Sequence, residues 1–140
     1  MSVLNSQFYN NTSTRGGAIS AVTSSDNPIR FTVDASTFIN NKAESAGAIY
    51  VSNHIMQIKN WNFESNRATQ GHGGSLYLDC PSYDKCEYDI YSNIFINNTA
   101  TIDGGAIKWI DIWPSNLTTN AYDNNSALYG NHIASYAKSI

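Results

Sequence analysis

The stretch FYNNTSTRGGAI, residues 8–19, carries the two signals that decide the fold. Phe8 is followed three residues later by Asn11. The run Gly-Gly-Ala-Ile at 16–19, three small residues and then an aliphatic one, is called the stop below. Both signals recur along the chain, with aromatic-to-aromatic steps of 30, 25, 32 and 27 residues. The aromatic–asparagine pairs are Phe8/Asn11, Phe38/Asn41, Phe63/Asn66, Phe95/Asn98 and Tyr122/Asn125. The stops occupy 16–19, 46–49, 73–76, 104–107 and, in degenerate form, 130–133. A repeat of this length indicates a solenoid.

Aligning the repeats on the aromatic residue reveals further columns of like residues. The position five residues before it is always aliphatic: Val3, Val33, Ile58, Ile90 and Leu117. The position five residues after it is always small: Ser13, Ala43, Ala68, Ala100 and Ala127. Parallel strands stacked about 4.8 Å apart place each side chain above its counterpart. Such like-on-like stacking fills a narrow core without voids.

The segments between these columns read as short strands. The runs 49–51 and 76–78 alternate with a period of two, whereas no window holds a helical apolar pattern over three turns. Gly-Gly and Asn-Asn pairs suit tight corners. We therefore predict that each repeat forms, in order, a strand, an asparagine turn, a glycine corner, a second strand and a variable loop.

The predicted fold is all-β, a right-handed parallel β-helix of about five coils, with handedness taken from the crossover rule. It forms one domain over residues 1–140, with coils at roughly 3–32, 33–57, 58–89, 90–116 and 117–140. The longest interval, between Phe63 and Phe95, contains a cysteine loop that should project from the side.

The asparagine and aromatic columns have predicted structural roles. Asparagine tolerates the left-handed conformation at a bend, and its amide can bond to the equivalent amides above and below. We expect an inward-facing asparagine ladder of Asn11, Asn41, Asn66, Asn98 and Asn125. The alternative is a polar ligand site. The aromatic residues Phe8, Phe38, Phe63, Phe95 and Tyr122 should form a core stack.

Composition excludes several functional classes. Charged residues make up 14%, and the net charge of −3 has no Lys/Arg run to attract nucleic acid or an anionic membrane. No apolar run reaches 18 residues, so we expect no membrane insertion. The opening 1–4 lacks the regions of a signal peptide, which suggests either a processed chain or a piece of a longer one.

The two cysteines, Cys80 and Cys86, flank the five residues 81–85. They could close a tight disulfide loop in an oxidising compartment, or remain two free thiols. We favour the disulfide because other features point to secretion. No metal or other cofactor is expected, because His54, His72 and His132 show no spacing that would assemble about four ligands.

The combination of Phe-x-x-Asn with Gly-Gly-Ala-Ile resembles the repeats of chlamydial polymorphic outer-membrane proteins. It also resembles the long secreted repeat proteins of ciliates and other protists that share them, most closely in the last repeat, residues 124–136. The resemblance covers essentially the whole chain. It implies a pectin-lyase-like right-handed β-helix on a cell surface or in a secreted matrix, in families that mostly serve adhesion or structure.

Asn-x-Ser/Thr sequons offer sites for covalent N-glycans. They start at Asn10, Asn11, Asn97, Asn116 and Asn124. Asn10, Asn97 and Asn124 share one column, two residues after the aromatic, which by alternation faces outward. The alternative is coincidence in a chain rich in asparagine and threonine.

An enzyme is not expected. Glycoside hydrolysis needs paired carboxylates, and a lyase needs calcium-binding acids with a base. Asp79, Asp84, Glu87 and Asp89 gather around the cysteine loop without occupying equivalent positions of adjacent coils, and Asp103 looks isolated. We interpret His72, which lies between two glycines, as a corner insertion rather than a catalytic base.

Carbohydrate binding is the competing function. Exposed aromatic rings can stack on sugars, and Tyr50, Tyr77 and Trp113 are candidates. The alternative is that these rings cover the flank of a thin solenoid.

The sequence-based prediction is a non-enzymatic, extracellular, glycosylated structural solenoid. Solenoids need caps, and no capping helix is evident beyond the first and last repeats. The chain is then either a fragment of a longer solenoid or a subunit that stacks head-to-tail on itself into a filament or surface coat, which we favour. The runner-up is a carbohydrate-binding or adhesive module of a larger surface protein.

Overall fold

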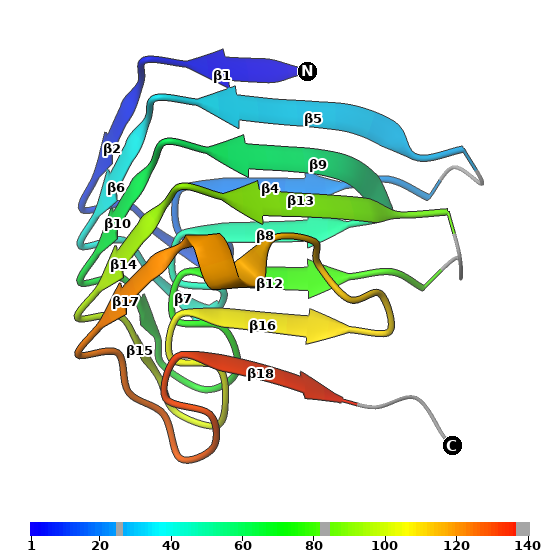
Figure 1. Cartoon of the computed structure of the whole chain (residues 1–140). Coiled ribbons are helices and arrows are strands. Elements are labelled where there is room, and N and C mark those ends of the chain that lie inside the picture. Colours follow the sequence, from blue (N-terminus) through cyan, green and yellow to red (C-terminus); the bar gives the residue numbers. More distant parts are fainter. Residues whose placement is uncertain (25–26, 82–84, 137–140) are drawn as a thin grey trace.

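The computed structural model describes residues 1–24, 27–81 and 85–136, and these form a β-solenoid with four parallel sheets (Figure 1). Two sheets have four strands and two have five, so the chain makes between four and five turns, in agreement with the prediction of about five coils. The chain winds right-handed from β1 at one end to β18 at the other (Figure 1). The short 3-10 helix η1 (Leu117–Thr119) interrupts the last turn.

Each of the first four turns contributes one strand to each sheet, and the last turn contributes strands to sheets B and D only. Sheet A contains β1 (Ser2–Leu4), β5 (Ile29–Asp34), β9 (His54–Lys59) and β13 (Glu87–Tyr91). Sheet B, which carries the aromatic column, contains β2 (Gln7–Tyr9), β6 (Thr37–Ile39), β10 (Asn62–Glu64), β14 (Ile94–Ile96) and β17 (Ala121–Asp123). Sheet C contains β3 (Thr12–Arg15), β7 (Lys42–Ser45), β11 (Arg67–Ala68) and β15 (Thr99–Ala100). Sheet D contains β4 (Ile19–Val22), β8 (Ile49–Ser52), β12 (Leu76–Asp79), β16 (Ile107–Ile110) and β18 (Ile133–Tyr136).

The strand registers reproduce the columns of the sequence alignment. Phe38 pairs with Phe8 on one side and Phe63 on the other, and Val33 pairs with Val3 and Ile58. Successive rings of the aromatic column stack nearly parallel, with centroids 4.7 to 5.3 Å apart. The core is therefore built from rows of like side chains, each row running the length of the solenoid.

Single residues with positive φ turn the chain from one sheet to the next. Between sheets B and C this residue is Asn10, Asn40, Ser65, Asn97 or Asn124. The left-handed bend therefore lies one position before the asparagine ladder, and our assignment of this conformation to the ladder residues was wrong. The reason is geometric: a ladder side chain must point into the core, whereas the left-handed corner turns its side chain outward.

The Gly-Gly stop between sheets C and D meets two separate demands. Its first position has positive φ, as at Gly73 (φ 65). Its second position leaves no room for a side chain, because a Cβ on Gly74 would meet the carbonyl oxygen of Gly105 in the next coil. Positive φ and a close carbonyl oxygen of the same coil, that of Leu76 for Gly73, thus select the first glycine, and contact between coils selects the second.

Candidate functional site

The asparagine ladder is a continuous hydrogen-bonded row through all five repeats. Nδ2 of each member donates to Oδ1 of the next, over 2.8 to 3.0 Å from Asn11 to Asn125. The Oδ1 of each later member also accepts the backbone N–H of the member before it, and the Nδ2 of Asn66 donates a second bond to the carbonyl of Phe38 at 3.0 Å. Asn41, Asn66 and Asn98 are fully buried, so their side-chain hydrogen bonds hold neighbouring coils together and are not open to a ligand.

A second, shorter row lies two residues before the aromatic column, which sequence reasoning missed. Nδ2 of Asn93 donates to Oδ1 of Asn120 at 2.9 Å, and Oδ1 of Asn93 accepts from the backbone N–H of Trp61 at 3.0 Å. Ser36 accepts from the backbone N–H of Ser6 in the same way. The aligned residues Ser6, Ser36, Trp61, Asn93 and Asn120 would have shown this column, with Trp61 as its single non-polar substitution.

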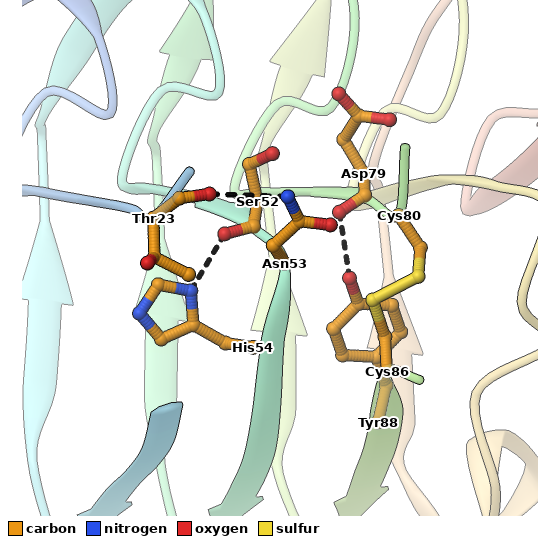
Figure 2. The surroundings of a disulfide bond; sticks show 8 residues. All are labelled: Thr23, Ser52, Asn53, His54, Asp79, Cys80, Cys86 and Tyr88. Atoms are coloured by element: carbon orange, nitrogen blue, oxygen red, sulfur yellow. Dashed lines mark hydrogen bonds between the residues drawn. A yellow bond between two sulfur atoms is a disulfide. The ribbon is translucent and has the colours of Figure 1, made fainter. Parts of the chain in front are cut away.

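The predicted disulfide between Cys80 and Cys86 is present, and Figure 2 shows its surroundings at the corner from sheet D to sheet A. Asp79 pairs with Ser52, and Glu87 pairs with Ile55. The two cysteines therefore take the places of Asn53 and His54, which are directly bonded neighbours in the preceding coil. The disulfide closes the base of an inserted loop, so that β12 and β13 continue as if no insertion had occurred.

Side-chain hydrogen bonds to backbone carbonyls stabilise this corner around the disulfide. The Tyr88 hydroxyl donates to the Asp79 carbonyl at 2.8 Å, and Asn53 Nδ2 donates to the Thr23 carbonyl at 3.0 Å (Figure 2). His54 Nδ1 donates to the Ser52 carbonyl at 2.6 Å, so its ring is engaged in the backbone of the corner. Asp84, which belonged to the acidic group weighed as catalytic, lies outside the described residues.

A polar cluster covers the outer face of sheet D, and it corrects two expectations. Asp103 is not isolated: its carboxylate receives Lys108 Nζ at 2.9 Å and His72 Nδ1 at 2.7 Å. His72 is not a lone corner residue. Lys108 is fully buried and lies under the ring of Tyr136, with Nζ 3.3 Å from the ring centroid.

Electrostatics in this cluster favour the ionised carboxylate. Burial alone would raise the pKa of Asp103, but the hydrogen bonds from Lys108 and His72 outweigh burial and hold the pKa below its ordinary value. The Asp103 charge in turn raises the pKa of the Tyr136 hydroxyl. This arrangement, a buried ion pair closed by an aromatic ring, joins the last two coils of sheet D.

The aromatic residues considered for sugar binding differ in exposure. Tyr50 is 7% exposed, covered by the Arg15 guanidinium and bonded through its hydroxyl to Asp79, so its assignment as an exposed ring was wrong. Tyr77 is half-buried, edge-on to Tyr50. Of the three, Trp113 is the most exposed, at 69%, and its ring lies edge-on to Trp109.

Trp113 borders a hollow of about 430 Å³ at the end of the last coil. Leu117, Tyr122 and Ile133 line this hollow, and each belongs to a column that forms the core in the preceding coils. Among the described residues, the hollow is therefore an open end of the solenoid core, at the face where a further coil would stack. Burial raises the pKa of the Tyr122 hydroxyl to about 12.

The sequon asparagines fall into three structural groups. Asn10, Asn97 and Asn124 are exposed at left-handed corners. Asn116 is exposed and donates from Nδ2 to Asp89 at 2.7 Å. Asn11 instead directs Nδ2 into the ladder, where it bonds Asn41, which makes it the least suited acceptor of the five.

The described residues contain no group of three or more His, Cys, Asp or Glu placed to hold a metal ion. Within the same ranges, no helix is long and apolar enough to cross a membrane.

Comparison with known families finds the Chlamydia polymorphic membrane protein repeat at three places, residues 5–22, 35–52 and 94–108. Each segment runs through one aromatic–asparagine corner and then through the glycine stop into sheet D. The chain therefore contains repeats of this type, arranged as a β-solenoid, as the sequence motifs indicated. No curated protein and no solved structure matched the chain.

Proposed function

We propose that this chain is a non-enzymatic, extracellular structural protein, a glycosylated β-solenoid whose copies stack head-to-tail into a fibre or surface coat. The observation that carries the proposal is the likeness of the two end coils. The first and last coils present the same columns: Phe8 and Tyr122, Asn11 and Asn125, Val3 and Leu117, and Ile19 and Ile133.

The end coils also carry exposed apolar surface. Leu4 and Leu128 are 59% and 71% exposed, and the hollow beside Trp113 offers open core on the last coil. The first coil of a second copy would place a valine, a phenylalanine and an isoleucine over this hollow. Such a contact joins unlike faces and does not close on itself, so it propagates into a filament.

Other features support the remaining parts of the proposal. The disulfide suits an oxidising compartment, and the matching repeats take their name from a membrane protein, which supports a place at a cell surface. The non-enzymatic assignment is supported by where the polar side chains lie. The ladder amides and the Asp103 cluster hold coils together, and neither presents a carboxylate pair to solvent.

Size measurement by light scattering after gel filtration, over a concentration series, tests the stacking. We expect the wild type to grow with concentration, and Trp113→Arg, which brings a charge to the hollow, to remain a monomer. The matched control is Ile94→Ser, which changes an exposed apolar residue on the outer face of the fourth coil. A wild type that stays monomeric at every concentration would refute the assembly.

Carbohydrate binding by a larger surface protein is the second candidate, favoured by the exposed ring of Trp113. An exposed indole face stacks on sugar rings. Glycan-array binding that Trp113→Ser abolishes, together with no self-assembly, would favour this function over the structural one.

A further inference from the structure

Two sequon asparagines touch each other on the surface. Asn97 and Asn124 occupy the same corner of adjacent coils, both with positive φ (56° and 49°), and both are exposed. Nδ2 of Asn124 donates to Oδ1 of Asn97 at 2.6 Å. The strands that precede them, β14 and β17, pair in register, so the two side chains leave the solenoid in the same direction.

This spacing is narrower than a pair of glycans needs. Adjacent parallel strands lie about 4.8 Å apart. An N-acetylated hexose ring with its substituents is wider than that spacing, and two such rings on neighbouring coils would have to occupy overlapping space. Splaying them apart would require one asparagine side chain to rotate about χ1 or χ2, which breaks the hydrogen bond between Asn124 and Asn97.

The hydrogen bond also distinguishes the two residues. The Asn124 nitrogen lies in the contact, whereas Asn97 takes part in it through its oxygen. A sugar on Asn97 Nδ2 leaves the contact intact, whereas a sugar on Asn124 Nδ2 stands beside the Asn97 side chain. The neighbouring coils thus make Asn97 the better acceptor.

We propose that Asn97 and Asn124 act as one glycan site, with the glycan on Asn97 and Asn124 left bare in the folded protein. The proposal rests on the glycosylated state proposed above. In the transfer, a bond forms between Asn97 Nδ2 and the anomeric carbon, and the nitrogen loses one proton. The anomeric C–O bond to the diphosphate of a lipid-linked oligosaccharide donor breaks.

Asn10 provides an internal comparison. It has the same left-handed corner and the same exposure, but its neighbour Asn40 is followed by Asn41 and Lys42 and so forms no sequon. Within the chain, occupancy at Asn10 should therefore depend on no site in a neighbouring coil. Asn116, on a different face and bonded to Asp89, should be independent as well.

The test is expression of the chain in a eukaryotic secretory host, followed by intact mass measurement and glycopeptide mapping of the folded fraction. We expect a glycan on Asn97 and at least tenfold lower occupancy at Asn124. In Asn97→Gln the Asn124 occupancy should rise at least fivefold, while occupancy at Asn10 stays constant.

Folded molecules that carry glycans at both sites would overturn the exclusion, as would an Asn124 occupancy that does not respond to Asn97→Gln. Preferential occupancy of Asn124 in the wild type would overturn the assignment of Asn97. Absence of glycan at every sequon would instead refute the glycosylated state itself. The two failures are therefore distinguishable in one data set.

Discussion

Replacing Asn66 by alanine removes a side chain from the middle of the asparagine ladder. Its Oδ1 accepts from the backbone N–H and the Nδ2 of Asn41, both at 3.0 Å. Its Nδ2 donates to the Phe38 carbonyl and to Asn98 Oδ1, also at 3.0 Å. Alanine therefore leaves two N–H groups of Asn41 without their acceptor and removes a donor from the Phe38 carbonyl.

The magnitude follows from these unpaired groups. Each buried donor or acceptor left without a partner costs about 1–3 kcal/mol. At about 2 kcal/mol for each group, two to three such groups predict a loss of about 4–6 kcal/mol for Asn66→Ala, a large part of the 5–15 kcal/mol typical of a folded domain. Asn11→Ala in the first coil is the matched control. Asn41 Oδ1 still accepts the backbone N–H of residue 11, so we expect a loss of only about 1 kcal/mol.

Urea denaturation followed by circular dichroism measures both free energies of unfolding. Asn66→Asp adds a test with nearly unchanged volume. The carboxylate cannot donate to Asn98 or Phe38, and burial favours its protonated form, so this variant should regain stability relative to wild type as the pH falls. Equal losses for Asn66→Ala and Asn11→Ala, or a loss below about 1 kcal/mol at Asn66, would refute the ladder as a source of stability.

Three further variants test other contacts in the solenoid. The double variant Cys80→Ser/Cys86→Ser should lower the free energy of unfolding by about 2.4 kcal/mol, which is the loop-closure entropy expected for a seven-residue loop. An unchanged free energy of unfolding would contradict a stabilising role for the disulfide. Asp103→Asn leaves a buried ammonium unpaired and should cost about 3–5 kcal/mol at neutral pH. The folded pKa of Asp103 lies below the ordinary 3.8, so its contribution is present above that value and is lost as the pH falls through the folded pKa. A gap between Asp103→Asn and wild type that stays constant down to pH 2 would contradict this account. Gly74→Ala should prevent folding or unfold near room temperature. Gly73→Ala also brings a Cβ against the carbonyl oxygen of Leu76, but it should cost less than Gly74→Ala, because Ala46 already occupies that left-handed position in the preceding coil. Thermal melts compare the pair, and similar melting temperatures would count against the two roles assigned to the stop.

The fold was predictable because stacked coils require similar residues at equivalent positions of each repeat. A residue such as Phe38 pairs with its own counterpart in the next coil, so spatial neighbours appear as aligned columns. The same logic located the ladder asparagines and the cysteine loop. The left-handed corner was misplaced by one residue because two adjacent asparagines, such as Asn97 and Asn98, divide the corner and the ladder between them.

Contacts between different columns were not predictable in this way. Asp103 meets His72 from the previous coil and Lys108 from the next strand of its own coil, and nothing in a single column signals that meeting. The burial of Tyr50 likewise depends on Arg15 reaching across from another coil. Variable insertions between coils hide such neighbours from sequence spacing, so the polar cluster on sheet D emerged only from the structure.

The proposed filament requires the first coil of one copy to stack on the last coil of another in the register used within the chain. Tyr9 and Asp123 are exposed members of one column on sheet B, at its two ends. In a head-to-tail contact their Cα atoms would lie about 4.8 Å apart, within disulfide range. Oxidation of the double variant Tyr9→Cys/Asp123→Cys should give a ladder of covalent oligomers on a non-reducing gel, whereas Ser20→Cys/Asp123→Cys, which joins different sheets, should not. A Tyr9→Cys/Asp123→Cys variant that stays monomeric after oxidation, or matching ladders from both variants, would contradict the claim.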